Sequence, residues 1–198
     1  MRYLKAAVGV LSLGVLGALC ALCARREPPQ VLCALALGII VHEAGHAIAM
    51  KVSGVAIKGL IFLPFGAIID TGKRSCPYLA ECGIYLAGPM AGFIAAALFW
   101  RRADPAEMNV AFCFSVLSLG LSCFNLLPLP GLDGAGALRA LLLHTSDNAN
   151  AAIRAVRVVQ AVFTVLFFLL AGALWLGWGI GEYPLLLGVF FLLRLFCG

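Results

Sequence analysis

Long apolar runs constrain this chain more than any other feature of its sequence. The runs are roughly 17 to 22 residues long, the length that a helix needs to cross about 30 Å of hydrocarbon. Of the 198 residues, 63% are hydrophobic and only 12% are charged, whereas soluble domains are near half apolar and a quarter charged. No polar stretch is long enough for a separate soluble domain. We therefore expect one membrane-embedded domain over residues 1–198.

The runs predict an all-α polytopic membrane protein with about six transmembrane segments. One stretch breaks the pattern: residues 55–69 are rich in β-formers, are interrupted by glycines, and are too short on either side of Pro64 to span as a helix. We predict a short re-entrant β segment there, shielded by protein, because irregular backbone cannot face lipid. The expected spans are residues 6–24, 31–50, 82–100, 110–127, 158–178 and 184–197, of which the last is marginal in length.

Basic residues predict which side of the membrane each loop faces. The net charge is +5, but the charges stand singly or in pairs beside apolar runs and form no basic groove, so nucleic acid is not an expected partner. With six spans, the N-terminal side carries Arg2, Lys5, Lys51, Lys58, Lys73, Arg74, Arg139, Arg154, Arg157 and Arg194, and the other side carries Arg25, Arg26, Arg101 and Arg102. The positive-inside rule then predicts that both termini face the cytoplasm.

The sequence His42-Glu43-Ala44-Gly45-His46 is an HExxH motif near the end of the second expected span. Histidines four residues apart share one face of a helix, about 6 Å apart along its axis, and can converge on one zinc ion. Glu43 can then act as general base. Two surface histidines without a function are not expected in an apolar span, because ionisable groups there are costly and usually functional. We predict zinc at His42 and His46.

The residues alone leave the third ligand open. Asp133 follows two helix-breaking prolines after the fourth span, at the membrane depth of the histidines. It is equally suited to capping a helix from Gly134 to His144. His144 and Cys123 can also ligate zinc, although a solvated surface residue and a packing thiol are the simpler readings of the two.

The combined motifs resemble the site-2 protease family of intramembrane metalloproteases. HEAGH is followed by Asn125-Leu-Leu-Pro-Leu-Pro-Gly-Leu-Asp133-Gly, which resembles the family's distal N-x-x-P…L-D-G motif. The segment 62–66 resembles its re-entrant β segment, and 86–89 its AGP motif. The resemblance implies that Asp133 completes the zinc site. It also implies that Asn125 steadies the substrate strand or the developing oxyanion, with interhelical hydrogen bonding as the alternative role for Asn125.

Within the family, the compact chain resembles the sporulation-type member that processes a membrane-tethered pro-sigma factor. No insertion of PDZ size separates the HEAGH span from the AGP segment, and we expect no PDZ and no CBS domain. Two departures stand out. The usual DGGR lacks its arginine here, and Gly92 stands where AGPxxN has asparagine.

The expected function is that of a zinc metalloendopeptidase, with one Zn²⁺ per chain, cutting membrane-associated substrates near the cytoplasmic side of the bilayer. The resemblance implies a bacterial cytoplasmic membrane, a membrane-tethered protein substrate such as a transcription factor, and a membrane-protein inhibitor as a further partner. The alternative is a multi-pass metal or small-solute transporter that uses the HExxH residues as a binding site. A transporter predicts more polar residues within the spans or a repeated segment pattern, and the sequence has neither.

Overall fold

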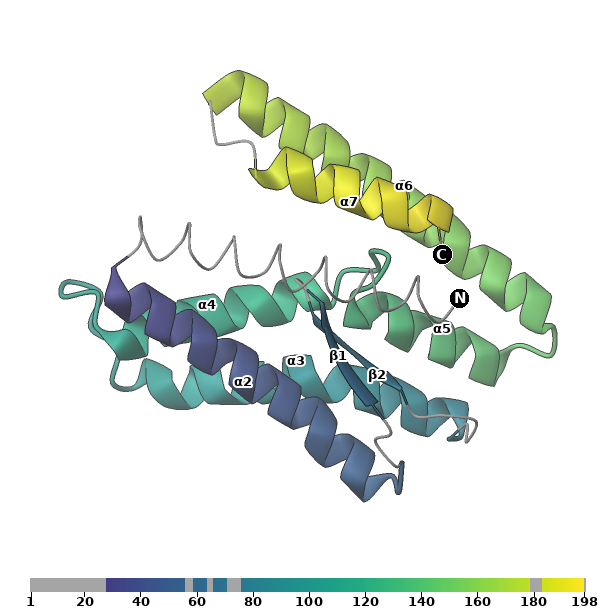
Figure 1. Cartoon of the computed structure of the whole chain (residues 1–198), viewed down its shortest axis with the longest axis horizontal. Helices are drawn as coiled ribbons and strands as arrows, with labels where there is room; N and C mark the ends of the chain where they lie inside the picture. Colours follow the sequence, from purple (N-terminus) through teal and green to yellow (C-terminus); the bar gives the residue numbers. More distant parts are fainter. Residues whose placement is uncertain (1–27, 56–58, 64–65, 71–75, 179–182, 198) are drawn as a thin grey trace. The chain divides into compact units, whose positions relative to one another are not determined.

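The computed structural model describes residues 28–55, 59–63, 66–70, 76–178 and 183–197, and it is mostly helical (Figure 1). The elements are α2 (Pro29–Val52), β1 (Gly59–Leu63), β2 (Gly66–Asp70), α3 (Tyr78–Trp100), α4 (Val110–Asn125), α5 (Asp133–Thr145), α6 (Ala149–Trp178) and α7 (Tyr183–Cys197). They form two compact units. One takes the described residues up to Pro77 together with Leu86–Phe124, and the other takes Tyr78–Tyr85 together with the chain from Asn125 onward.

Among the described residues, three helices are long and apolar enough to cross a membrane: Pro29–Val52, Tyr78–Trp100 and Ala149–Gly177. The helix α4 is apolar but has only 16 residues, about 24 Å at 1.5 Å per residue. The expected first span, 6–24, lies outside the described residues. The described part of the chain therefore agrees with a polytopic membrane protein, while the count of six spans stays a prediction.

The helix α6 begins nine residues before the expected start of its span at 158. The Asn148 side chain explains this start, because its Oδ1 accepts a hydrogen bond from the backbone N–H of Ala151 at 3.1 Å and so satisfies a free donor of the first turn. Arg154 and Arg157 in these first turns are exposed. Hydropathy alone places the span correctly but misses the polar turns that precede it.

Small residues bring α2, α3 and α4 together in the first unit. A Cβ built on Gly45 would lie 2.5 Å from the carbonyl oxygen of Ala87, so the backbones approach as closely as glycine allows. The Ser118 hydroxyl of α4 donates to the Gly92 carbonyl of α3 at 3.1 Å. A buried cluster of Ala34, Cys113 and Phe114, with Val31, Val41, Ala95, Phe112 and Leu117 packed against it, fills the space further along these helices.

The predicted β segment contains an antiparallel strand pair. The strands β1 and β2 pair from Gly59 with Asp70 to Leu63 with Gly66, so β2 ends one residue past the expected limit of 69. Two residues, 64 and 65, separate the strands. Glycine and proline keep this stretch from forming a helix, so its backbone donors and acceptors need other partners. The strand pairing supplies those partners. Its re-entry into a bilayer stays a prediction.

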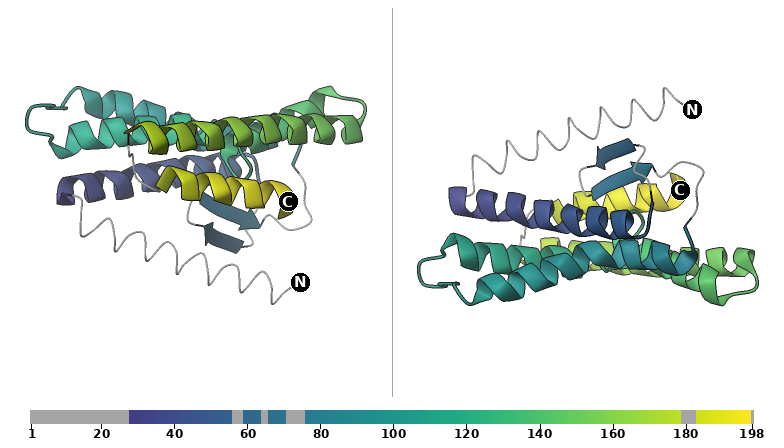
Figure 2. Two further views of the ribbon diagram at one scale, coloured as in Figure 1. Left: turned by 90° about the horizontal axis from the view of Figure 1, so that it is seen from above. Right: turned by 90° about the horizontal axis from the view of Figure 1, so that it is seen from below.

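In the second unit, α6 and α7 lie side by side (Figures 1 and 2). The Phe167 and Phe191 rings meet edge to face with centroids 5.5 Å apart, an arrangement that aromatic pairs favour. The helix α5 packs its small residues Ala137 and Ala140 against Cys82, with the Tyr85 ring beside them. This packing holds the helix that begins at Asp133.

Candidate metal centre

The two histidines of the HExxH motif face one another on α2. His42 and His46 are buried, at 5% and 7% exposure, and their Nε2 atoms are 3.2 Å apart. Their ring centroids are 4.8 Å apart, with the ring planes 80° to one another. The donor and acceptor of this contact depend on the tautomers. The geometry identifies Nε2 as the atom that each ring presents to a shared ligand.

The distance between the two nitrogens fits a shared zinc ion. A tetrahedral ion with Zn–N bonds of about 2.0–2.1 Å holds two imidazole nitrogens roughly 3.3 Å apart. The observed 3.2 Å is close to that value. The predicted histidine pair is therefore already arranged as one edge of a metal site.

Gly88 of α3 makes room for the second histidine. A Cβ built on Gly88 would overlap the His46 ring, with Nε2, Cε1 and Cδ2 as its nearest atoms. The imidazole therefore lies flat against the α3 backbone, and any larger residue would push it away. The motif at 86–89 pointed to this segment only by resemblance, and nothing in the residue spacing tied Gly88 to His46.

Asp133 is the first residue of α5. The residue that caps this helix is Leu132, and its cap includes no side-chain hydrogen bond. The capping role considered for Asp133 is therefore wrong, because its carboxylate belongs to the first turn, where the helix dipole favours a negative charge. The helix begins at Asp133, one residue before the start at Gly134 that was expected from the sequence.

Gly134 fixes the chain path beside that carboxylate. A Cβ built there would overlap the carbonyl of Leu126, so the chain folds back tightly on the end of α4. Gly131, in the turn, has φ of +94°, a conformation that glycine adopts without strain. Gly131 thus shapes the turn that leads into α5, and Gly134 allows the close approach that follows it.

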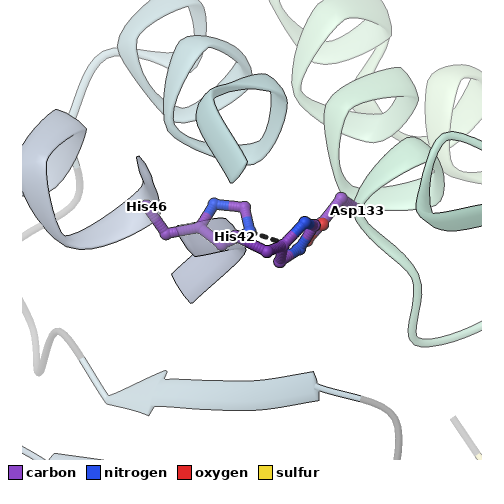
Figure 3. A group of neighbouring side chains, drawn as sticks. All are labelled: His42, His46 and Asp133. Carbon is purple, nitrogen blue, oxygen red and sulfur yellow. Dashed lines mark hydrogen bonds between the residues drawn. The ribbon is translucent and has the colours of Figure 1, made fainter. Parts of the chain in front are cut away.

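His42, His46 and Asp133 form a group that could hold a metal ion (Figure 3). One ligand atom from each residue lies within 4.8 Å of the others. Two imidazole nitrogens and one carboxylate oxygen are a donor set typical of catalytic zinc, which also keeps a position open for water. The donor chemistry and the nitrogen spacing therefore both fit the zinc predicted from the sequence.

The other predicted residues lie as follows. Glu43 is half-buried and directly follows His42 on α2. Asn125 is the last residue of α4 and is 6% exposed. The two alternative ligands, Cys123 and His144, are exposed, and among the described residues neither joins the metal-binding group.

Comparison with known proteins shows which family of proteins this chain resembles. Residues 30–104 match the model of Peptidase family M50. The putative zinc metalloprotease Rip3 of Mycobacterium tuberculosis is 30% identical over 165 residues, which are 73% of this chain and 42% of Rip3. Stage IV sporulation protein FB of Bacillus subtilis is 28% identical over 112 residues, 55% of this chain and 39% of that protein. The alignments span less than half the length of these curated relatives.

The fold was also compared with solved structures. The site-2 protease from Methanocaldococcus jannaschii matches this fold with a TM-score of 0.62 at 22% identity, over 96% of this chain and 86% of that chain. The chain thus has a site-2 protease fold. The resemblance predicted from the HExxH and L-D-G motifs is confirmed: this chain is similar to the M50 peptidases of the site-2 protease type.

Proposed function

We propose that this chain is an intramembrane zinc metalloendopeptidase whose ligands are His42, His46 and Asp133. The observation that carries the proposal is the group of three ligand atoms within 4.8 Å of one another, on a chain whose long helices have membrane composition. When bound, zinc supplies a Lewis acid that lowers the pKa of a water molecule and polarises a carbonyl group.

Glu43 is the proposed general base. Its place next to His42 keeps the carboxylate on the helix that presents both histidines, within reach of a water molecule at the group. In this role Glu43 takes a proton from the attacking water and later delivers it to the leaving amide nitrogen. Half-burial leaves the Glu43 carboxylate a route to solvent.

Asn125 is proposed to donate its side-chain N–H to the substrate strand or to the developing oxyanion. Its place at the buried end of α4, eight residues before Asp133, puts an amide on the segment that also bears the third ligand. Donors aimed at developing charge are effective in a water-poor site because the local dielectric is low.

The proposed substrate is a membrane-tethered protein, such as a transcription factor held at the membrane. A substrate helix must unwind locally, because its peptide bonds are internally satisfied. The strand pair β1–β2 offers backbone edges that can hold such an unwound strand. We place the chain as a single domain in a bacterial cytoplasmic membrane with both termini in the cytoplasm. Regulation by a membrane-protein inhibitor fits this arrangement.

The variant Glu43→Gln tests the proposed chemistry. Glutamine cannot accept the proton, while the ligands are unchanged, so cleavage of a membrane-tethered reporter should stop and zinc should stay bound. Glu81→Gln, at the start of α3, is the control and should cleave normally. Substantial turnover by purified Glu43→Gln protein would contradict the proposed base.

A further inference from the structure

A buried serine without a hydrogen-bond partner lies in the first unit, on α4. Ser122 is 1% exposed, and its Oγ has no partner among the described residues. Ser115 and Ser118 are equally buried on the same helix, but their hydroxyls donate to the carbonyls of Ala111 and Gly92. Leaving a buried hydroxyl unmet costs about 1–3 kcal/mol. A hydroxyl that stays buried at such a cost is expected to have a partner that it meets only in the working protein.

The packing of α4 on α2 gives the level at which Ser122 lies. Ala34 clusters with Phe114, and a Cβ built on Gly38 would lie 3.8 Å from the Cα of Ser118. Each residue of the second pair is four positions further along its helix than the first, so the two helices run in the same direction. One more step of four residues reaches Ser122 on α4 and the first histidine on α2.

The packing of α3 on α2 leads independently to the same place. A Cβ on Gly88 would overlap the His46 ring, and a Cβ on Gly92 would overlap the Ser122 hydroxyl. Since α2 and α3 run in opposite directions (Figure 1), one turn forward on α3 corresponds to one turn back on α2. Gly92 and Ser122 therefore come level with His42. Two registers, from different helix pairs, converge on this histidine.

We propose that the Ser122 hydroxyl is a positioning residue for His42. In the zinc-loaded protein it accepts a hydrogen bond from the Nδ1–H of the imidazole, directly or through one ordered water. The Nε2 of His42 faces that of His46, so the bond is made by the other ring nitrogen, Nδ1, which is buried. Histidine ligands almost always donate their second N–H to an oxygen, which fixes the tautomer and the ring orientation. The inference rests on the proposed zinc site.

The first test compares Ser122→Ala with Ser115→Ala. Ser115 is the matched control, because it is equally buried on the same helix and its hydroxyl bonds within α4. Zinc affinity of the purified full-length protein, measured by chelator competition, should fall about 10- to 100-fold in Ser122→Ala and stay near wild type in Ser115→Ala. The metal-free melting temperature should not fall in Ser122→Ala, since the lost hydroxyl has no partner in the described chain.

Two further variants separate positioning from packing. Ser122→Thr keeps the hydroxyl and should keep most of the zinc affinity. Gly92→Ala places a methyl group where the Ser122 hydroxyl lies, so it should also weaken zinc binding. This variant tests the proposal independently if Ser122→Ala fails to fold. The visible absorption of the cobalt-substituted protein should shift in Ser122→Ala and not in Ser115→Ala, because only the former changes the orientation of a ligand.

The proposal is overturned if folded Ser122→Ala and Gly92→Ala both bind zinc as tightly as wild type, with an unchanged cobalt spectrum. A metal-free Ser122→Ala that melts well below wild type would also overturn it, because that result marks a packing role. Failure of the proposed function is distinguishable: wild-type protein itself would then bind no zinc.

Discussion

The histidine turn of α2 and the segment that leads into α5 present their ligand atoms by different means. His42 and His46 belong to one regular helix, so their spacing follows from helical geometry. Asp133 follows an irregular turn that depends on Gly131 and Gly134. The histidine pair needs only a helix and room for its rings, whereas the carboxylate needs a particular chain path.

The two regions should therefore respond differently to substitution. On α2, substitutions that crowd the rings should lower metal affinity without unfolding the helix. Around the turn before α5, substitutions that alter the chain path should lower stability together with metal affinity.

Asp133→Asn should abolish cleavage and weaken zinc binding beyond the 10- to 100-fold that loss of an outer-sphere partner typically costs. Asparagine is nearly isosteric but lacks the charge that offsets the dication in a low-dielectric site. Zinc content of the purified variant, with the exposed residue changed in Asp147→Asn as control, measures this. A fully metallated, active Asp133→Asn protein would remove Asp133 from the ligand set.

Gly88→Ala should weaken zinc binding on the order of 10- to 100-fold, the usual effect of losing an outer-sphere contact that orients a ligand. The new methyl group would displace the His46 ring, while α3 remains helical. Gly83→Ala is the control on the same helix, since a Cβ there meets nothing within 4 Å. Equal zinc affinities for the two alanine variants would show that Gly88 does not position the ring.

Gly134→Ala should lower stability by about 1–3 kcal/mol, the usual cost of forcing an atom into a packed site. The added Cβ would overlap the carbonyl of Leu126, so the turn must open. Gly172→Ala on α6 is the control, because its Cβ meets open space. Thermal unfolding in detergent compares the two, and a Gly134→Ala protein as stable as the control would refute the tight fold-back.

Gly131→Ala should have the smallest effect, a loss of about 1–2 kcal/mol from the left-handed backbone alone. The nearest atoms to a Cβ at this position belong to Arg194 and lie 3.8 Å away, so crowding adds nothing. Gly131→Asn should recover part of the loss, since asparagine tolerates positive φ better than alanine does. If alanine and asparagine are equally destabilising, backbone strain is not the cause.

The sequence predicted well what depends on regular helix geometry. The HExxH spacing was enough to pair His42 with His46, and hydropathy located the spans within α2, α3 and α6. The third ligand could not be chosen from spacing, because its place depends on a turn between two helices. Only the resemblance favoured Asp133 over a capping role, and the start of α5 excludes that role.

Contacts between helices could not be predicted from the sequence. Gly88 against His46 and Gly92 against Ser122 are approaches between residues distant in the chain. A glycine in an apolar run does not reveal which neighbour it admits. The polar first turns of α6 were missed for a different reason: hydropathy detects the apolar span but not a helix that begins before it.

The zinc content of the wild-type protein, compared with that of His46→Ala, shows whether the histidine pair holds zinc. Both proteins are purified at full length in detergent, with His144→Ala as a control at an exposed histidine. We predict one zinc per chain in wild type and in His144→Ala, and little or none in His46→Ala. A wild-type protein without zinc, or a His46→Ala protein with one zinc per chain, would show that His42, His46 and Asp133 do not form a zinc site.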